Sequence, residues 1–567
     1  DNYAVAIGFR SCNATTTATQ FTAVGGDALK STTTGGSNVA VGYAAGSSLT
    51  TGGNNVIMGT AVMQANVTGS SNVVIGHRAY RLGNAGSSNV GVGLEVLEDN
   101  TGSNNTAIGN NAMKENTSGE NNTALGNEAL KSNTDGFHNT AIGFDALKDH
   151  SGANNNTAVG SQALENSTSG LQNTSVGSTS MQTLTTGTRN VAMGHGAMQA
   201  ATEAERNVAI GTEALGSLTT GDENVAVGRA ALYATTTPAQ NTAVGDNCLK
   251  LNTTGANNTA VGHSALDANT TANDNTAVGC TALSANTTGT ANVAMGFQAL
   301  DANTTGGSNV AIGYDAMGSN TTANHNTAVG KNALNANTTG TQNTVVGSNS
   351  MTASSTAGNC TLVGYLAGQQ ITTGGANTAL GMMALYSTTT GTDNIGIGKQ
   401  AGQDVTSGTN NMFFGLDAGR SGTPSGSVST GSNQLCMGNN SISNCFIKVD
   451  WTVTSDRRDK TDIEPFKHGL SWINKLNPVT YRWDNRSFYE DGKPDGSKKQ
   501  KQLNVGLIAQ DEIEVEKEHG FGDTAENMIV SHINEDGDYG MQYAKLVPIL
   551  INAVKELSTK VTALEAG

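Results

Sequence analysis

Polar and apolar residues recur along most of the chain with a period of seventeen. Aligned on the recurrent Asn, successive units begin at Asn275 and Asn292, seventeen residues apart. The same spacing runs from residue 4 to residue 411 and gives 25 units, with one slip of a single residue between Asn89 and Asn105. Self-similarity at a short fixed period is typical of solenoids and other repeat arrays.

Each unit predicts two short extended pieces separated by turns. A typical unit reads NTAVGxxALxxNTTGxx. In the first piece, alternation places Val293 and Met295 on one face and Ala294 on the other. The second piece is the Ala-Leu pair, as at 299–300. The Asn-Thr-Thr-Gly stretch at 303–306 has turn chemistry, because Gly tolerates positive φ and Asn bonds its own backbone. The period is too short for paired helices, so we predict a mainly β fold, an elongated β-solenoid or β-roll.

The small size of the side chains bears on the oligomeric state. A unit carries three or four apolar side chains, mostly Ala, Val and Leu, whereas each ordered residue costs about 1.5 kcal/mol of conformational entropy. We therefore expect three chains to pool their apolar faces into a shared core as a homotrimer, although single-chain solenoids also exist. Asn at one fixed position of all units except those at Ala4, Phe21 and Cys360 predicts a hydrogen-bonded ladder.

Composition divides the chain near residue 450. Charged residues are 13% of the whole and aromatic residues 4%, whereas about 25% charged residues is usual. Residues 451–567 hold all three Trp and 35 charged residues, and the first 450 residues hold the other 41. The net charges of -11 and -5 sum to -16. Because no basic stripe is present, we expect no nucleic-acid partner.

Several other chemistries are not expected. The cysteines have no CxxC spacing and are predicted to be free thiols; they are Cys12, Cys248, Cys280, Cys360, Cys436 and Cys445. His468, His519 and His532 lack ligand-like spacing, and we expect them to be surface or hydrogen-bonded residues. We predict no cofactor and no metal. No run of eighteen apolar residues occurs, which predicts no membrane insertion, and no signal segment follows Asp1.

The repeats from residue 4 to residue 415 resemble the head repeats of trimeric autotransporter adhesins. In that family, NSVAIG-like segments coil into a trimeric β-roll, so the resemblance implies a trimeric fibrous head. The end of this chain departs from that family, because it shows no membrane-anchor segment. We therefore expect a bacterial-type surface adhesin to be the less favoured interpretation.

Four ordered blocks near the C-terminus carry a second resemblance. They are SDRRDKTDI at 455–463, LNPVTYRW at 476–483, GLIAQD at 506–511 and YAKLVP at 543–548. They resemble the C-terminal intramolecular chaperone domain of phage tail fibres and tail spikes, of which the endosialidase spikes are members; membrane-bound transcription factors of animals share it. The resemblance implies a domain that trimerises, drives folding of a β-rich body and then cuts itself off with a Ser/Lys dyad.

The resemblance assigns roles to three residues. It implies that Ser455 is the nucleophile, that Lys460 is the base, and that the Thr454–Ser455 bond is cleaved. Independent chemistry agrees, because a serine hydroxyl needs a base and a lysine serves when burial lowers its pKa. Five residues apart, the two would lie about 140° apart on one helix. We therefore place Ser455 in a strand or loop before a helix that begins near Lys460, and we expect residues 456–459 to form ion pairs or trimer contacts.

The remaining segments complete three predicted domains: 1–415, the repeat fibre body; 416–454, a closing β segment and cleavage linker with strands at 446–449 and 451–453; and 455–567, the small α+β chaperone and autoprotease domain. Its last helix should begin near Leu546, since Pro548 fits only the first turn. A heptad seam predicts a two- or three-stranded coiled coil, with packing in a helical core as the alternative; the seam consists of Val547, Leu550, Val554, Leu557, Val561 and Leu564.

These features together predict a phage virion tail fibre or spike, a trimeric rod for host-surface attachment. Its partners would be two further copies, a host cell-surface receptor of unknown chemistry and other virion tail proteins, and it would assemble in the host bacterial cytoplasm. The enzymatic prediction is a single-turnover serine endopeptidase acting in cis, with no other activity. A glycan-degrading spike would need paired carboxylates, whereas Asp145, Glu165 and Glu213 occupy unrelated repeat positions and are expected to be solvated. Ice binding by Thr rows is a further alternative.

Overall fold

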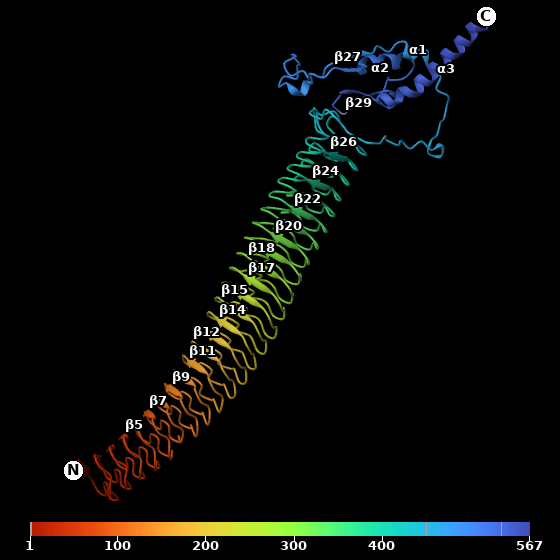
Figure 1. Ribbon diagram of the computed structural model, residues 1–567. Coiled ribbons are helices and arrows are strands. Elements are labelled where there is room, and N and C mark those ends of the chain that lie inside the picture. Colours follow the sequence, from red (N-terminus) through yellow and green to blue (C-terminus); the bar gives the residue numbers. More distant parts are fainter. Residues whose placement is uncertain (1–2, 450, 535) are drawn as a thin grey trace. The chain divides into compact units, whose positions relative to one another are not determined.

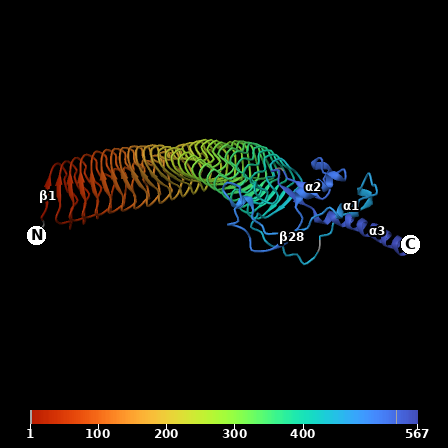
Figure 2. The same ribbon diagram turned by 90° about the horizontal axis from the view of Figure 1, so that it is seen from above.

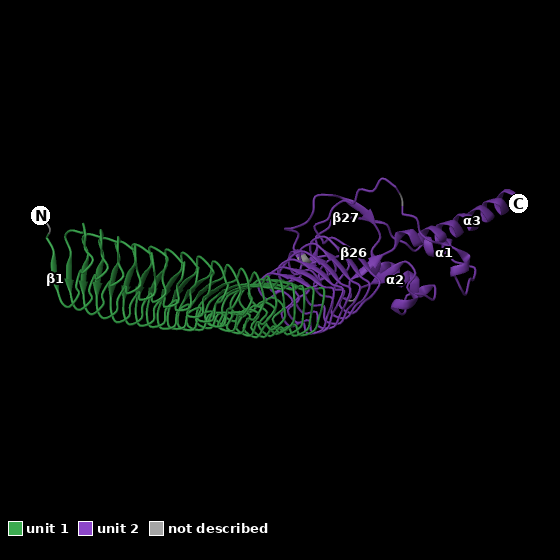
Figure 3. Ribbon diagram, turned by 90° about the horizontal axis from the view of Figure 1, so that it is seen from below, with its two compact units in different colours: residues 1–325 green, residues 326–567 purple. Residues whose placement is uncertain are grey.

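The computed structural model describes residues 3–449, 451–534 and 536–567. Its fold is mainly β, a parallel β-solenoid of 17-residue repeats followed by a small C-terminal region with helices and two antiparallel sheets. Two compact units can be distinguished, residues 1–325 and residues 326–567 (Figure 3). The predicted fold class is confirmed. The three predicted domain boundaries stay predictions.

The first unit is a stack of coils, each contributing one three-residue strand (Figure 1). Neighbouring strands pair in parallel with a register of seventeen residues, as in Val293 with Val310. The predicted slip appears as a shorter coil, in which Val90 pairs with Thr106. The strands are β1 (Val5–Ile7), β2 (Thr22–Val24), β3 (Val39–Val41), β4 (Val56–Met58), β5 (Val73–Ile75), β6 (Val90–Val92), β7 (Thr106–Ile108), β8 (Thr123–Leu125), β9 (Thr140–Ile142), β10 (Thr157–Val159), β11 (Thr174–Val176), β12 (Val191–Met193), β13 (Val208–Ile210), β14 (Val225–Val227), β15 (Thr242–Val244), β16 (Thr259–Val261), β17 (Thr276–Val278), β18 (Val293–Met295) and β19 (Val310–Ile312).

From β2 onward each coil encloses a narrow core, and successive coils lie one behind the next (Figure 2). In β18, Ala294 is fully buried, whereas Val293 is half-buried and Met295 is exposed. The predicted alternation is therefore confirmed, with Ala on the inner face. We expected three chains to share one core, but these apolar side chains are buried within a single chain. Buried Leu side chains such as Leu300 and the buried Asn side chains fill the space beside the small Ala side chains.

The prediction that the Ala-Leu pair is a second extended piece is wrong. The pair forms a turn in which Leu300 and Gln298 both have φ of 55°. This left-handed conformation costs an L-residue roughly 1–2 kcal/mol. It persists because the Leu300 side chain enters the core and its N–H donates to the carbonyl of Ala316, one coil on, at 3.0 Å.

The recurrent Gly and Asn have separate structural tasks. Gly296 has φ of 137°, and a Cβ there would lie 2.4 Å from the carbonyl oxygen of Gly313 in the next coil. The predicted Asn ladder is confirmed, since the Nδ2 of Asn292 donates to the Oδ1 of Asn275 at 3.2 Å and to the carbonyl of Gly306 at 2.9 Å. A second ladder joins Asn303 to Asn286 at 2.9 Å. Neighbouring coils thus satisfy most of the buried amides.

The second unit continues the same coil type to a last strand that the period does not predict. Its strands are β20 (Thr327–Val329), β21 (Thr344–Val346), β22 (Thr361–Val363), β23 (Thr378–Leu380), β24 (Ile395–Ile397), β25 (Met412–Phe414) and β26 (Leu435–Met437). The register from β25 to β26 is longer, because Met412 pairs with Leu435. The strands predicted at 446–449 and 451–453 are absent from the described residues: Phe446, Trp451 and Val453 are exposed, and no strand of this chain pairs with them. Asp450, between them, lies outside the described residues.

The described residues between 456 and 567 form helices and two antiparallel strand pairs, with one buried apolar cluster. Trp472, Val515, Val530 and Ile549 are its buried members. The elements are η1 (Arg457–Asp459), α1 (Leu470–Ile473), β27 (Val479–Tyr481), η2 (Arg486–Phe488), β28 (Asn504–Gly506), α2 (Ala509–Glu518), η3 (Ala525–Asn527), β29 (Ser531–Ile533), β30 (Tyr539–Met541), η4 (Tyr543–Lys545) and α3 (Leu546–Glu565). The predicted start of the last helix at Leu546, with Pro548 in its first turn, is confirmed. Among the described residues, none of these helices combines the length and hydrophobicity that a bilayer crossing needs.

Candidate active site

The Thr454–Ser455 bond lies in an exposed stretch outside any helix or strand. Ser455 is exposed, as is Lys460. Ser455 therefore lies in a loop before the nearest helix, as expected. A peptide bond in such a stretch can be approached by a neighbouring nucleophile.

A single turn of 3-10 helix separates Ser455 from Lys460. This turn, η1, spans Arg457–Asp459, and Lys460 follows it in an extended conformation. A helix beginning near Lys460 was therefore a wrong prediction, because the next helix, α1, begins at Leu470. The physical reason lies in the local sequence: Pro465 disfavours helical backbone at the residue before it, and Asp462 has φ of 51°.

The turn brings the two predicted catalytic side chains together. The Nζ of Lys460 donates to the Oγ of Ser455 at 2.6 Å. A base within hydrogen-bond reach of a hydroxyl is the arrangement that nucleophilic catalysis requires. Between them, Asp456 and Arg458 form an ion pair at 2.6 Å, as expected for ion-pairing residues of this segment.

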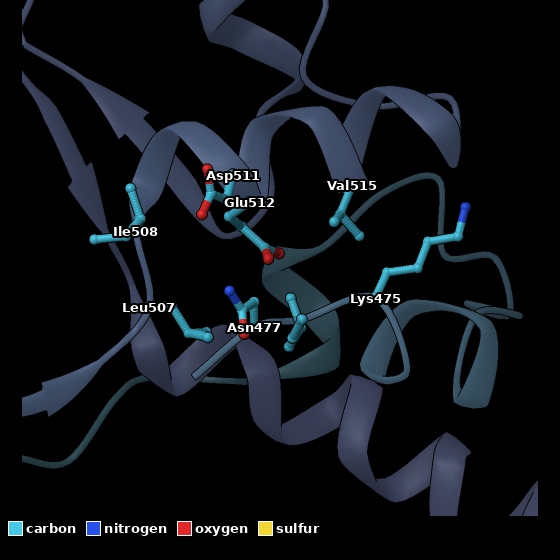
Figure 4. A pocket seen from close by; sticks show the side chains of 8 residues that line it. Lys475, Asn477, Leu507, Ile508, Asp511, Glu512 and Val515 are labelled. Carbon is cyan, nitrogen blue, oxygen red and sulfur yellow. The ribbon is translucent and has the colours of Figure 1, made fainter. Parts of the chain in front are cut away.

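Two buried carboxylates on α2 had no sequence prediction. Glu512 is almost fully buried and accepts a hydrogen bond from the Nε1 of Trp472 at 2.8 Å, while its Oε2 has no hydrogen-bond partner. Burial raises the pKa of Glu512 to about 7, with the nearby Glu516 adding to the shift and Trp472 opposing it. Figure 4 shows Glu512 reaching from α2 into a small hollow, which Asn477 and Leu507 also line.

Glu516 lies one turn further along α2 and is satisfied by backbone donors. It is fully buried and accepts the N–H groups of Val530 and Ser531, both at 2.7 Å, and that of Ile529 at 3.2 Å. Helical spacing of four residues was the only available sign that both carboxylates share one face. Which face is buried depends on the α1 and β29 segments that cover it.

Of the three histidines in this region, His519 is hydrogen-bonded, as expected. His519 has one ring nitrogen 2.8 Å from the carbonyl of Val515 and the other 3.2 Å from the Oγ of Ser471. Its ring stacks on Trp472 at a centroid distance of 4.8 Å. His468 is half-buried and His532 is exposed.

Helix α3 has two unlike faces. Ile549 and Ala553 are buried against the small core. The predicted heptad seam lies on the other face and is exposed along its whole length; the exposed residues are Val547, Leu550, Val554, Leu557, Val561 and Leu564. The seam is therefore not packed into a helical core within one chain.

Three carboxylates of the repeats, Asp145, Glu165 and Glu213, were predicted to be solvated. They do not form the pair of carboxylates that a glycosidase needs. Glu213 is exposed, and Glu165 accepts a hydrogen bond from Gln182 at 2.8 Å. Asp145 was wrongly expected to be solvated: it is buried, its pKa is raised by burial, and it forms an ion pair with Lys148 at 3.8 Å.

A comparison with known families gives a match in the C-terminal region. Residues 455–521 match the family described as "Chaperone of endosialidase", which implies self-cleaving, peptidase-type activity. The match begins at Ser455 and includes three of the four sequence blocks, while the block at 543–548 lies beyond it. Neither the comparison with curated proteins nor that with solved structures gave a match. The C-terminal region of this chain is thus similar to the chaperone of endosialidase, and a β-solenoid of 17-residue repeats precedes it.

Proposed function

We propose that the chain is a phage virion tail fibre or spike, a trimeric rod for host-surface attachment whose C-terminal domain folds it and then cleaves itself off before Ser455. One observation carries the proposal. The family match begins at Ser455, and Lys460 within that match donates a hydrogen bond to the Ser455 hydroxyl. A rod with a removable C-terminal folding domain accounts for the long repeats and for the dyad together.

The proposed reaction uses Lys460 in its neutral form as the base. Lys460 takes the proton from the Oγ of Ser455, and the Oγ attacks the carbonyl carbon of Thr454. The Thr454–Ser455 C–N bond breaks, and Lys460 returns the proton to the departing nitrogen. The ester left between Thr454 and the Oγ is then hydrolysed by water, which yields the carboxylate of Thr454 and restores the hydroxyl of Ser455.

Burial of the dyad by neighbouring subunits would couple this reaction to assembly. A lysine serves as a general base when removal from water lowers its pKa. In the single chain, the Lys460 side chain is exposed. We therefore propose that trimerisation covers Lys460, so that cleavage follows correct assembly instead of preceding it.

The outward face of the repeat strands supports the homotrimer. The third residue of each strand β1–β19 points away from the coil's own core, yet in every strand it is Val, Ile, Leu or Met. Met193 and Met295 are 43% and 42% exposed. The first residue of each strand is Val or Thr, so this face carries no charge. A partner that matches an apolar row coil by coil must have the same repeat, which another copy of this chain has.

The exposed seam of α3 supports the same assembly. Six apolar residues at heptad spacing are solvent-exposed on a helix that is otherwise anchored to its domain. Seams of this kind are buried in coiled coils of two or more helices. Together with the strand face, the seam favours copies in parallel register, as a domain that aligns repeats requires.

Intact-mass measurement of the expressed full chain tests the self-cleavage. The parent should yield two products, residues 1–454 and 455–567, whereas Ser455→Ala and Lys460→Ala should each give one uncut chain. Ser443→Ala and Lys467→Ala, which change exposed residues nearby, should be cut like the parent. Cleavage at another bond, or in either dyad variant, would contradict the assignment.

Sedimentation and labelling test the assembly and its place. The uncut Ser455→Ala chain should sediment as a trimer, and a folded monomer would rule out the shared strand face. Antibodies against the repeats should label purified virions at the tail. Labelling of bacterial surfaces without virions would favour the adhesin instead, and release of sugars from host capsular glycan would favour a degrading spike.

A further inference from the structure

The contact between Ser455 and Lys460 depends on a single tight turn. In a 3-10 helix, three residues make one full rotation, and η1 consists of the three residues Arg457–Asp459. The chain therefore enters and leaves the turn on the same side. The flanking residues Asp456 and Lys460 are extended, with ψ of 133° and 136°, which lets the Lys460 side chain return to Ser455.

The carboxylate of Asp456 holds this turn from its N-terminal end. Its Oδ1 accepts the backbone N–H of Arg458 at 2.9 Å, which is the capping hydrogen bond of η1. The Arg458 guanidinium closes the other side, donating from Nε to both carboxylate oxygens at 3.1 Å and from Nη2 to Oδ2 at 2.6 Å. An acidic or amide side chain at this position satisfies a backbone donor that the short helix leaves without a partner.

We propose that Asp456 is a positioning residue for self-cleavage: its capping hydrogen bond to the Arg458 N–H folds the 456–459 turn and thereby sets the Lys460 amine against the Ser455 hydroxyl. The inference rests on the proposed Ser/Lys reaction. Asp456 touches neither the scissile carbonyl nor the proton in transfer. It acts by keeping two exposed, flexible side chains in hydrogen-bond reach, and misplacement by about 1 Å already slows reactions of positioned groups strongly.

The charge state of Asp456 suits this role. The hydrogen bonds from the Arg458 guanidinium and from the Arg458 backbone N–H lower its pKa below the usual range. The carboxylate therefore remains ionised at any pH at which a lysine can act as a base. Positioning by Asp456 should change the rate of cleavage at every such pH by the same factor.

Timed cleavage of newly made full-length chain tests the proposal. Samples from a pulse-labelled cell-free synthesis would be stopped at intervals, and the fraction cut at Thr454–Ser455 measured at several pH values. Asp456→Ala should slow cleavage about tenfold, in the range expected for loss of an N-cap. Asp456→Asn keeps an oxygen that accepts the Arg458 N–H, and its rate should stay within about twofold of the parent.

Two further variants separate the backbone cap from the ion pair. Arg458→Ala removes the guanidinium but keeps the backbone N–H, so it should slow cleavage less than Asp456→Ala does. Arg457→Ala, an exposed position in the same turn, is the matched control and should be cut at the parental rate. All four variants should keep the parental shape of the pH–rate profile.

Each contrary result is informative. Parental cleavage in Asp456→Ala would overturn the positioning role, as would an Asp456→Asn variant as slow as Asp456→Ala. A shifted pH profile in Asp456→Ala would show that the carboxylate affects the proton transfer itself, which also overturns it. Because Asp456→Asn preserves the cap, its recovery of the rate would exclude general misfolding as the cause of slow cleavage. Cleavage in Ser455→Ala or Lys460→Ala would instead overturn the proposed function.

Discussion

The repeats and the C-terminal region differ in how they bury polar groups. In the repeats, most buried Asn side chains are hydrogen-bonded to a neighbouring coil, as Asn292 is to Asn275 and Gly306. In the C-terminal region, Glu512 is buried with one oxygen unpartnered, and a single indole donates to the other. The first arrangement spreads stability over many similar contacts. The second concentrates it in a few residues, whose state depends on pH.

This difference suits the proposed roles of the two regions, a lasting rod and a folding domain that is cleaved off. A stack of coils that contact only their neighbours has a stability that is close to a sum of similar terms, and loss of one term leaves the others in place. A small domain built around one Trp has a small free energy of unfolding, so the loss of a single contact can unfold it. A durable body and a removable folding domain would need these opposite designs.

Removal of the central Trp should have the largest effect. Trp472→Ala in the Ser455→Ala chain should destabilise the C-terminal region by about 3–5 kcal/mol, because a fully buried aromatic side chain is lost. Calorimetry should show loss or a large downward shift of that region's transition, with the solenoid transition unchanged. Trp483→Ala, at a half-exposed Trp, is the control. A matching fall in the solenoid transition would contradict the separation of the two regions.

The next largest effect should come from pH acting on Glu512. Its pKa in the folded chain, about 7, lies above the ordinary 4.5, so folding favours the protonated form. The stabilising contribution of that form is complete below about pH 4.5 and is lost as the pH rises to about 7, at a cost of up to about 3 kcal/mol. Glu512→Gln should remove this dependence.

The measurement is the denaturant midpoint of the Ser455→Ala chain, followed by Trp fluorescence from pH 4.5 to pH 8. The Glu512→Gln chain should vary less than the parent over this range. Glu514→Gln, at an exposed position of the same helix, should follow the parental curve. Parallel curves for the parent and Glu512→Gln would contradict the prediction, because they would mean that the Glu512 carboxyl is ionised throughout this pH range or is exposed to solvent.

A single rung of the Asn ladder should matter least. Asn292→Ala removes the acceptor of the Asn309 N–H and one of the two hydrogen bonds to the carbonyl of Gly306, which keeps that from Asn303; the loss costs about 1–3 kcal/mol. Hydrogen exchange should speed up in the coils next to residue 292 and remain unchanged in distant coils. Thr290→Ala, at an exposed residue outside the strands, should leave exchange unaltered. Faster exchange throughout the solenoid would show that the coils unfold as one unit.

The two regions also differ in how well the sequence predicts them. Within the repeats, the seventeen-residue period predicted the strands, the shorter coil after Asn89 and the Asn ladder, because each residue's partner is its equivalent in the next coil. The turn at Leu300 was not predicted, since its positive φ is offset only by packing inside the coil. In the C-terminal region, the start of α3 followed from Pro548, but the burial of Glu512 did not follow from any local pattern.

The candidate site shows the same limit at short range. Ser455 and Lys460 were identified from their resemblance to a known domain, whereas the helix expected to begin near Lys460 was wrong. Five residues allow several backbone paths, and the choice among them is made by the Asp456 cap and by the extended residues on either side of η1. Capping by Asp456 is compatible with the sequence, but SDRRDK alone does not distinguish it from a solvated charged segment.

By itself, the sequence determined the repeat, its period and the residues that must recur in it, because translation by one coil places like beside like. It also determined where the charged region begins and which two side chains to examine there. The tertiary structure alone decided that Ala faces inward and Met295 outward, that Glu512 is enclosed beside Trp472, and that Lys460 turns back onto Ser455. Those outcomes depend on which surfaces meet in space, and a one-dimensional pattern does not contain that information unless it repeats.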